Sequence, residues 1–206
     1  AQKIIDLSGK WSFSIDRQDN GEKEKWFSHT LNDFINLPGS MPEKLKGDEV
    51  TAKTQWTGSL YDSSYYYNPY MEKYRKEGNI KFPFFLTPDK HYVGAAWYQK
   101  EVNIPADWKG ERILLFLERP HIETTVWVNG QKTGMQNSLC VPHQYDITRY
   151  VRPGKCTITI RVDNRIKEIN VGPDSHSITD QTQGNWNGIV GRICLQTTPK
   201  TYFDDI

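Results

Sequence analysis

Short segments in which apolar and polar residues alternate dominate the chain, and this is the pattern of half-buried β-strands. In the segment 10–16, for example, Trp11, Phe13 and Ile15 share one face while serine and lysine occupy the other. We expect Trp11 and Trp127 to be core residues on this alternation. Further strands are predicted at 97–104, 112–118, 123–128, 144–148, 156–162 and 189–197, and a return strand begins at 131–132.

Turn signals separate these strands at regular intervals. The strongest is Asn129-Gly130, because a two-residue hairpin turn needs a positive φ at both positions. Further turns are expected at 36–39, 105–110 and 152–155, and a long polar loop at 163–187 precedes the last strand. Eight or more strands with almost no helix predict an all-β fold, a two-sheet sandwich of the jelly-roll kind.

The segment of about 43–92 fits this pattern poorly and is predicted to be an insertion. Asn68 is a good helix cap, Pro69 suits the first helical position and Gly78 is a plausible stop, so a short helix is expected at 69–77. The insertion is also rich in tyrosine. It is either a lid, an extension of a binding cleft or, more simply, a tyrosine-rich plug packed on the sandwich.

Composition and charge exclude several classes of protein. Hydrophobic residues make up 36% of the 206 positions and charged residues 25%, as in ordinary globular domains. There is no run of about 18 apolar residues, so no membrane span is expected. The net charge is +1 without a basic stripe, which argues against a nucleic-acid partner.

Cysteine and histidine patterns give no sign of a metal site. The three cysteines lack the spacing of a zinc site, and Cys156 and Cys194 are predicted to be buried free thiols. The five histidines show no i, i+4 pairing. The chain starts without a leader, and we expect a bacterial protein that is secreted or periplasmic after signal removal rather than cytoplasmic.

Motifs for several enzyme classes are absent, including the nucleophile elbow and the phosphate-binding loop. Glycoside cleavage needs two carboxyl groups that flank the bond. The best-placed acids are Asp163 and Asp180, which border the long loop. Asp163 with Asn164 is more simply read as an Asx-type turn, and loop acids commonly serve as caps or turn residues.

Several motifs occur in a familiar order. Leu7-Ser8-Gly9-Lys10-Trp11 opens the chain, and Val126-Trp127-Val128-Asn129-Gly130 forms the central hairpin. This order resembles the N-terminal sugar-binding domain of family 2 glycoside hydrolases, which include β-galactosidases and β-glucuronidases. The other segments that carry the resemblance are 94–110, 145–154, 158–164 and 185–192.

The resemblance implies a galactose-binding-domain-like sandwich that spans 1–206 as a single domain with the insertion. In this family a separate (β/α)8 barrel carries both catalytic glutamates of the retaining reaction. The resemblance therefore implies that the barrel and all catalytic residues are absent from this chain. We predict that the isolated domain does not hydrolyse glycosides. Its expected partners are a β-glycoside and the remaining domains of the same enzyme.

The resemblance also implies where substrate would bind. In the β-galactosidase branch, the loop before the last strand reaches the substrate, and its acidic residue sometimes works with a sodium ion. Asp180 resembles that residue, so a sodium ion is expected near it in the intact enzyme, with no other cofactor. Carboxylates and amides bind sugar hydroxyls, and tryptophan can stack on a pyranose. The predicted substrate-binding residues are His91, Asp180, Gln181, Asn185, Trp186 and Asn187.

Two further functions stay open on the sequence. A free-standing lectin-like module would bind glycan through exposed aromatic residues in a groove. A purely architectural domain would instead form an interface of about 1,000 Å² or more with itself. The motifs do not select the sugar, because galactoside, glucuronide and mannoside branches share them.

Overall fold

The computed structural model describes residues 2–58, 62–83, 85–167, 171–172 and 174–202. The described chain forms two compact units. The first comprises the described parts of Ala1–Ser40, Gly94–Asn164 and Asn187–Ile206. The second comprises those of Met41–Val93 and Arg165–Trp186. The second unit thus contains the predicted insertion and, in addition, most of the polar loop before the last strand.

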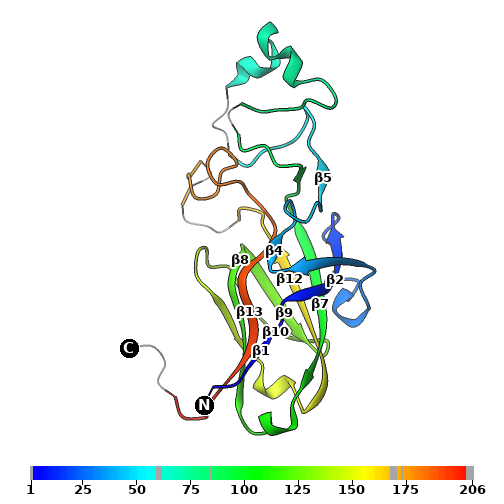
Figure 1. The fold of residues 1–206 in the computed structure, drawn as a ribbon, viewed down its shortest axis with the longest axis vertical. Coiled ribbons are helices and arrows are strands. Elements are labelled where there is room, and N and C mark those ends of the chain that lie inside the picture. Colours follow the sequence, from blue (N-terminus) through cyan, green and yellow to red (C-terminus); the bar gives the residue numbers. More distant parts are fainter. Residues whose placement is uncertain (1, 59–61, 84, 168–170, 173, 203–206) are drawn as a thin grey trace. The chain divides into compact units, whose positions relative to one another are not determined.

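The first unit is a β-sandwich of antiparallel strands (Figure 1). One sheet has the order β10-β9-β12-β7-β2-β3, and the other has the order β1-β13-β8-β11 with β4 paired to β13. The predicted sandwich is confirmed. Its strands are β1 (Ile4–Asp6), β2 (Gly9–Asp16), β3 (Asp33–Leu37), β4 (Gly39–Ser40), β7 (Ala95–Ile104), β8 (Arg112–His121), β9 (Glu123–Val128), β10 (Gln131–Gln136), β11 (His143–Asp146), β12 (Gly154–Asp163) and β13 (Gly188–Thr198).

The central strand β12 shows how alternation builds the core. Its residues Ile158, Ile160 and Val162 are all fully buried. In the register of the sheet, Ile160 lies between Tyr98 of β7 and Val126 of β9, which are also fully buried. Successive side chains of a strand point to opposite faces. These residues therefore form the apolar face of the six-stranded sheet.

The opposite face of this sheet is covered as well, which the alternation did not predict. Trp97 and Trp127 lie there side by side, with ring centroids 4.9 Å apart, and both are buried. Leu31, Trp26 and Phe27 pack on them from the segment between β2 and β3. The prediction that Trp127 is a core residue is confirmed, although its core lies on this second face.

Glycine is required at two points of the first unit, in the β9–β10 turn and at the start of β13. Asn129 and Gly130 have φ values of 50° and 76°, and they join β9 to β10 as predicted. Gly188 begins β13 where the backbone of β4 comes very close. A Cβ at Gly188 would lie 2.5 Å from the carbonyl oxygen of Gly39, so no side chain fits there without a shift of the backbone.

The second unit contains little regular structure. Its two strands, β5 (Asp48–Glu49) and β6 (Lys90–His91), form a small antiparallel ribbon. Two 3-10 helices follow one another, η2 (Ser63–Tyr66) and η3 (Pro69–Tyr74). Asn68 caps η3 by accepting a hydrogen bond from the backbone N–H of Tyr70 at 3.0 Å, as predicted. The helix is nevertheless a 3-10 helix, and it ends at Tyr74 instead of residue 77.

Tyrosines of the insertion divide into buried and exposed groups. Tyr65 is 1% exposed and stacks on Phe82, with ring centroids 4.6 Å apart, so this part of the cluster is a plug. Tyr66, Tyr67 and Tyr70 are 44%, 71% and 86% exposed. The plug therefore accounts for only part of the tyrosine cluster, and it packs within the second unit.

The remaining 3-10 helices are single turns of the first unit: η1 (Trp26–Ser28), η4 (Ala106–Trp108) and η5 (Thr148–Tyr150).

The three cysteines are free thiols. Cys156 and Cys194 are buried, as predicted, and Cys140 is exposed. Within the described residues, no helix is both long and apolar enough to cross a membrane.

Candidate functional site

A buried carboxylate, that of Asp180, organises the polar loop of the second unit. Asp180 is 2% exposed. Its Oδ1 accepts a hydrogen bond from the backbone N–H of Asn185 at 2.6 Å, and its Oδ2 accepts one from the backbone N–H of Thr57 at 2.6 Å. Backbone donors of this kind hold a carboxylate strongly, because hydrogen bonds to a charged acceptor are short and strong.

His91 completes this arrangement from strand β6. Its Nε2 lies 3.3 Å from Oδ2 of Asp180, the longest of the three polar contacts of that carboxylate. The imidazole is 7% exposed and packs edge-on against the ring of Trp56, with centroids 4.8 Å apart. Trp56 in turn stacks on Phe85 at 5.3 Å. The imidazole of His91 is thus held against the aromatic residues of the second unit.

Thr57 ties the loop to the insertion with both its backbone and its side chain. Its carbonyl oxygen accepts a hydrogen bond from the N–H of Asp180 at 3.0 Å. Its hydroxyl oxygen accepts one from the side-chain amide of Asn185 at 3.0 Å. Sequence reasoning missed Thr57, because a backbone partner 123 positions away from Asp180 leaves no local pattern.

An open pocket adjoins His91 within the same unit. Its volume is about 310 Å³, at the lower end of the range of roughly 300–1,000 Å³ for small-molecule sites. Hydroxyl, amide and charged side chains line it, which suits a ligand rich in hydroxyl groups. The lining residues are Asp48, Glu49, Thr51, Lys53, Thr54, Gln55, His91, Tyr92 and Val93.

The structure brings together three of the six predicted site residues, His91, Asp180 and Asn185. Gln181 and Trp186 are half-buried in the same loop. The side-chain oxygen of Gln181 is buried and has no hydrogen-bond partner among the described residues.

Asn187 lies elsewhere, in the first unit, where it is fully buried. Its Oδ1 accepts a hydrogen bond from the hydroxyl of Tyr98 at 2.7 Å. Its Nδ2 donates to the carbonyl oxygens of Gly94 and Val162, both at 2.9 Å. These bonds tie Asn187, which directly precedes β13, to strands β7 and β12 and to Gly94, so its geometry is that of a structural residue.

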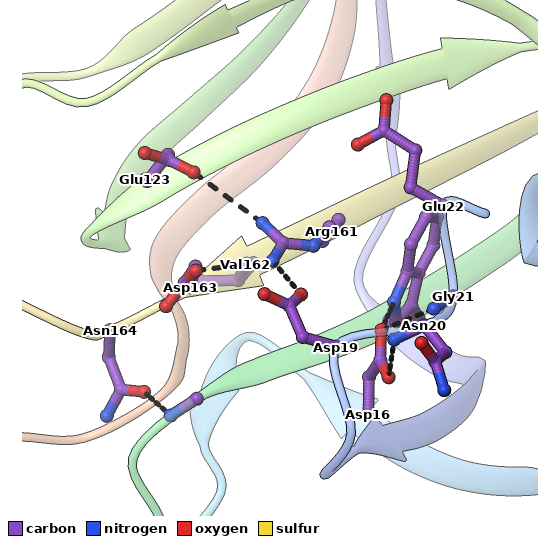
Figure 2. A network of polar contacts seen from close by, with 12 residues as sticks. Asp16, Asp19, Asn20, Gly21, Glu22, Glu123, Arg161, Val162, Asp163 and Asn164 are labelled. Atoms are coloured by element: carbon purple, nitrogen blue, oxygen red, sulfur yellow. Dashed lines mark hydrogen bonds and ion pairs between the residues drawn. The ribbon is translucent and has the colours of Figure 1, made fainter.

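Asp163, the other candidate carboxyl group, belongs to an ion-pair network of the first unit (Figure 2). Arg161 lies 3.2 Å from Asp163, 2.5 Å from Asp19 and 3.5 Å from Glu123. The side chain of Arg161 is 8% exposed and that of Asp163 is fully buried. The geometry therefore assigns Asp163 to a buried ion pair.

A second acid, Asp16, fastens the segment between β2 and β3 to the six-stranded sheet. Oδ2 of Asp16 accepts hydrogen bonds from Trp97 Nε1 at 2.9 Å and from the backbone N–H of Gly21 at 2.8 Å, and Oδ1 accepts one from Asn20 at 2.9 Å (Figure 2). A Cβ at Gly21 would lie 2.5 Å from Trp97 Nε1. Asp16 and Asp19 thus fix the start of the segment between β2 and β3, which covers the second face of the sheet.

The surroundings of Asp180 do not fit a sodium ion. A cation of this kind needs several free oxygen ligands. Both carboxylate oxygens of Asp180 instead face N–H donors of Asn185 and Thr57, and a ring nitrogen of His91. Among the described residues there is also no group of three or more histidine, cysteine or acidic side chains placed to hold a metal.

Comparison with known proteins agrees with the fold. The chain is 25% identical to a β-glucuronidase from Homo sapiens over all of this chain and 30% of the relative, and 27% identical to one from Paenibacillus borealis over 79% and 21%. The chain therefore spans less than a third of the length of these relatives.

Solved structures with this fold include the β-glucuronidase of an uncultured Clostridium species, with a TM-score of 0.64, 22% identity and coverage of 97% of this chain and 30% of that one. The β-glucuronidase of Ruminococcus gnavus in complex with uronic isofagomine gives a TM-score of 0.65 at 17% identity, over 97% and 29%. The model of the family "Glycosyl hydrolases family 2, sugar binding domain" matches residues 4–199. The chain belongs to this family of sugar-binding domains of glycoside hydrolases.

Proposed function

We propose that this chain is the non-catalytic N-terminal domain of a longer retaining glycoside hydrolase, in which it packs on the catalytic barrel and lends a loop to the substrate site. The relatives that bear the name β-glucuronidase support a β-glucuronide as the substrate, rather than the β-galactoside implied by the resemblance of Asp180 to the β-galactosidase branch. The catalytic carboxyl groups belong to the remaining domains in this proposal.

The orientation of the Asp180 carboxylate is the observation that carries the proposal. A carboxylate has about four lone-pair positions, and three are occupied by Asn185, Thr57 and His91. The contact with His91 is the longest, at 3.3 Å. The fourth position is on Oδ1, where a sugar hydroxyl would donate to Asp180 without disturbing the two backbone donors or the contact with His91.

The pocket beside His91 supports the same proposal. A sugar ring in this space would place its hydroxyl groups next to the imidazole, which is already held by Asp180 and Trp56. The alternative of a free-standing lectin-like module requires the chain to bind glycan without the other domains. The exposed rings of Tyr67 and Tyr70 are the observation that favours it.

Kinetics of the longer enzyme that carries this domain test the proposal. We expect Asp180→Ala to lower kcat/KM for p-nitrophenyl β-glucuronide by about 100-fold, equivalent to about 2.7 kcal/mol of transition-state binding. His176→Ala is the matched control, because His176 is an exposed residue of the same loop. A kcat/KM in Asp180→Ala equal to that of the control would refute the role of the loop.

The substrate class is tested in the same assay with β-glucuronide, β-galactoside and β-mannoside. The proposal expects the β-glucuronide to be the best substrate of the three. A preference for the β-galactoside would contradict this substrate class and favour the β-galactosidase branch of the family. Binding of the same sugars by the 206-residue chain alone, lost in Tyr67→Ala or Tyr70→Ala, would favour the lectin-like alternative.

A further inference from the structure

A second pocket, of about 370 Å³, lies within the first unit. It is bordered by η1 and the segment after it, the β9–β10 hairpin, and strands β7 and β12. None of its residues belongs to the group around Asp180. The residues that line it are Phe27, Ser28, His29, Thr30, Gln99, Asn129, Gly130 and Thr157.

Gln99 is a fixed polar group in this pocket. It is 8% exposed, and its Nε2 donates hydrogen bonds to the carbonyl oxygen of His29 at 2.9 Å and to the hydroxyl of Thr159 at 3.1 Å. Both N–H groups of the amide are thus used. The amide oxygen accepts no hydrogen bond from any described residue, so it is available to a ligand hydroxyl.

Phe27 provides an aromatic wall. One face of its ring stacks on Trp127, with centroids 5.0 Å apart and planes within 5° of each other. Trp127 is itself stacked on Trp97 at 4.9 Å. The ring of Phe27 is half-buried and held by this stack, and it also lines the pocket. An aromatic ring fixed in this way suits the apolar C–H face of a pyranose.

The remaining wall is rigid as well. Oδ1 of Asn129 accepts a hydrogen bond from the backbone N–H of Thr157 at 2.9 Å, and Nδ2 donates to the carbonyl oxygen of Tyr150 at 3.2 Å. These bonds fix the hairpin next to strand β12. Hydroxyl groups of Ser28, Thr30 and Thr157 also line the pocket, and the fixed hairpin lowers the entropic cost of binding at its side of the pocket.

The chemistry of the lining defines the ligand. It contains hydroxyl, amide and imidazole groups and one aromatic wall, but no aspartate, glutamate, lysine or arginine. We propose that this pocket is a second carbohydrate site, which binds a neutral pyranose residue of a glycan. It is independent of the Asp180 loop and of the function proposed for that loop. Because the lining contains no lysine or arginine, it lacks the positive charge that would favour the carboxylate of glucuronate.

Titration of the 206-residue chain with neutral tetrasaccharides tests the site. Cello-, xylo-, manno- and β-galactotetraose are added up to about 10 mM while backbone amides are followed by NMR, since weak glycan binding falls in the millimolar range. At least one of them is expected to shift the amide signals of Gln99, Gly130 and Thr157. D-Glucuronic acid is the charged comparison and is expected to leave these signals unchanged.

Thr157→Tyr fills the pocket from the outer face of β12 and is expected to weaken binding by roughly tenfold or more. Asn103→Tyr is the matched control, because it adds the same ring at an exposed position of β7 outside the pocket.

The proposal is overturned if none of the four tetrasaccharides shifts these amide signals, or if Thr157→Tyr binds as tightly as Asn103→Tyr. An equal response to glucuronic acid would overturn the assignment to neutral sugars. Failure of the Asp180 kinetics described above would leave the outcome of this titration unaffected, so the two proposals are tested separately.

Discussion

Replacing Asn187 with alanine distinguishes a structural residue from a substrate-binding one. The change removes the acceptor of the Tyr98 hydroxyl and the donor to the carbonyl oxygens of Gly94 and Val162. The site is fully buried, so water does not replace the lost partners. An orphaned buried hydroxyl costs about 1–3 kcal/mol, and each lost hydrogen bond to a carbonyl about 1 kcal/mol. We expect the free energy of unfolding to fall by about 3–5 kcal/mol.

Urea denaturation followed by tryptophan fluorescence measures this loss. With an m-value of about 2 kcal/mol/M, the unfolding midpoint should fall by about 1.5–2.5 M. Tyr98→Phe removes only the hydroxyl partner and should cost about 1 kcal/mol. The two changes together should cost less than the sum of their separate effects, because they share one hydrogen bond.

Asn103→Ala is the matched control for this series, since Asn103 is an exposed asparagine of strand β7. Its expected effect is within about 0.5 kcal/mol. The reasoning is wrong if Asn187→Ala is as stable as this control. If the same variant also lowered kcat/KM of the longer enzyme, Asn187 would be a substrate-binding residue, as the resemblance implied.

Three further predictions concern the first unit. Gly188→Ala should lower the free energy of unfolding by about 2 kcal/mol in urea denaturation, because its Cβ would overlap the backbone of β4. Gly154→Ala has a positive φ as well but open space around it, so it should cost less than Gly188→Ala. Burial raises the pKa of the Cys156 thiol to about 11. A chromogenic thiol reagent at pH 8 should therefore react rapidly with only one thiol of the native chain, the exposed Cys140. Rapid reaction of a second thiol would contradict the burial of Cys156. Burial lowers the pKa of His143, despite the opposing hydrogen bond to a backbone carbonyl, so the unfolded chain takes up a proton at a higher pH than the folded chain does. The free energy of unfolding should therefore fall as the pH drops below about 6.5. His143→Gln should flatten that part of the stability–pH curve, and an unchanged slope would refute the assignment.

Local patterns were sufficient to predict the strands of the sandwich. Alternation located β2, β7, β9 and β12, because the side-chain period of two is visible within a few residues. The Asn129-Gly130 turn followed from the conformational demand of a tight hairpin. The short strands β1, β3 and β4 were missed, since two to five residues that pair along an edge carry too little pattern to be recognised.

The candidate site was less accessible to sequence reasoning. The motif before the last strand indicated Asp180, but its partner Thr57 comes from the insertion and contributes a backbone group, which carries no sequence signal. Asn187 sits in the same motif, yet its geometry is that of a structural residue, because one sequence motif contains both packing and polar positions. Only the folded chain separates these two roles.

A crystal structure of the longer enzyme with a bound glucuronate mimic tests the central proposal most directly. Uronic isofagomine is a suitable ligand, because one solved complex of the Ruminococcus gnavus β-glucuronidase contains it. The proposal predicts a carboxylate oxygen of Asp180 within about 3.2 Å of a ring hydroxyl of the ligand, with His91 beside it. A ligand held entirely by other domains, with no sugar hydroxyl within about 4 Å of Asp180, would contradict it.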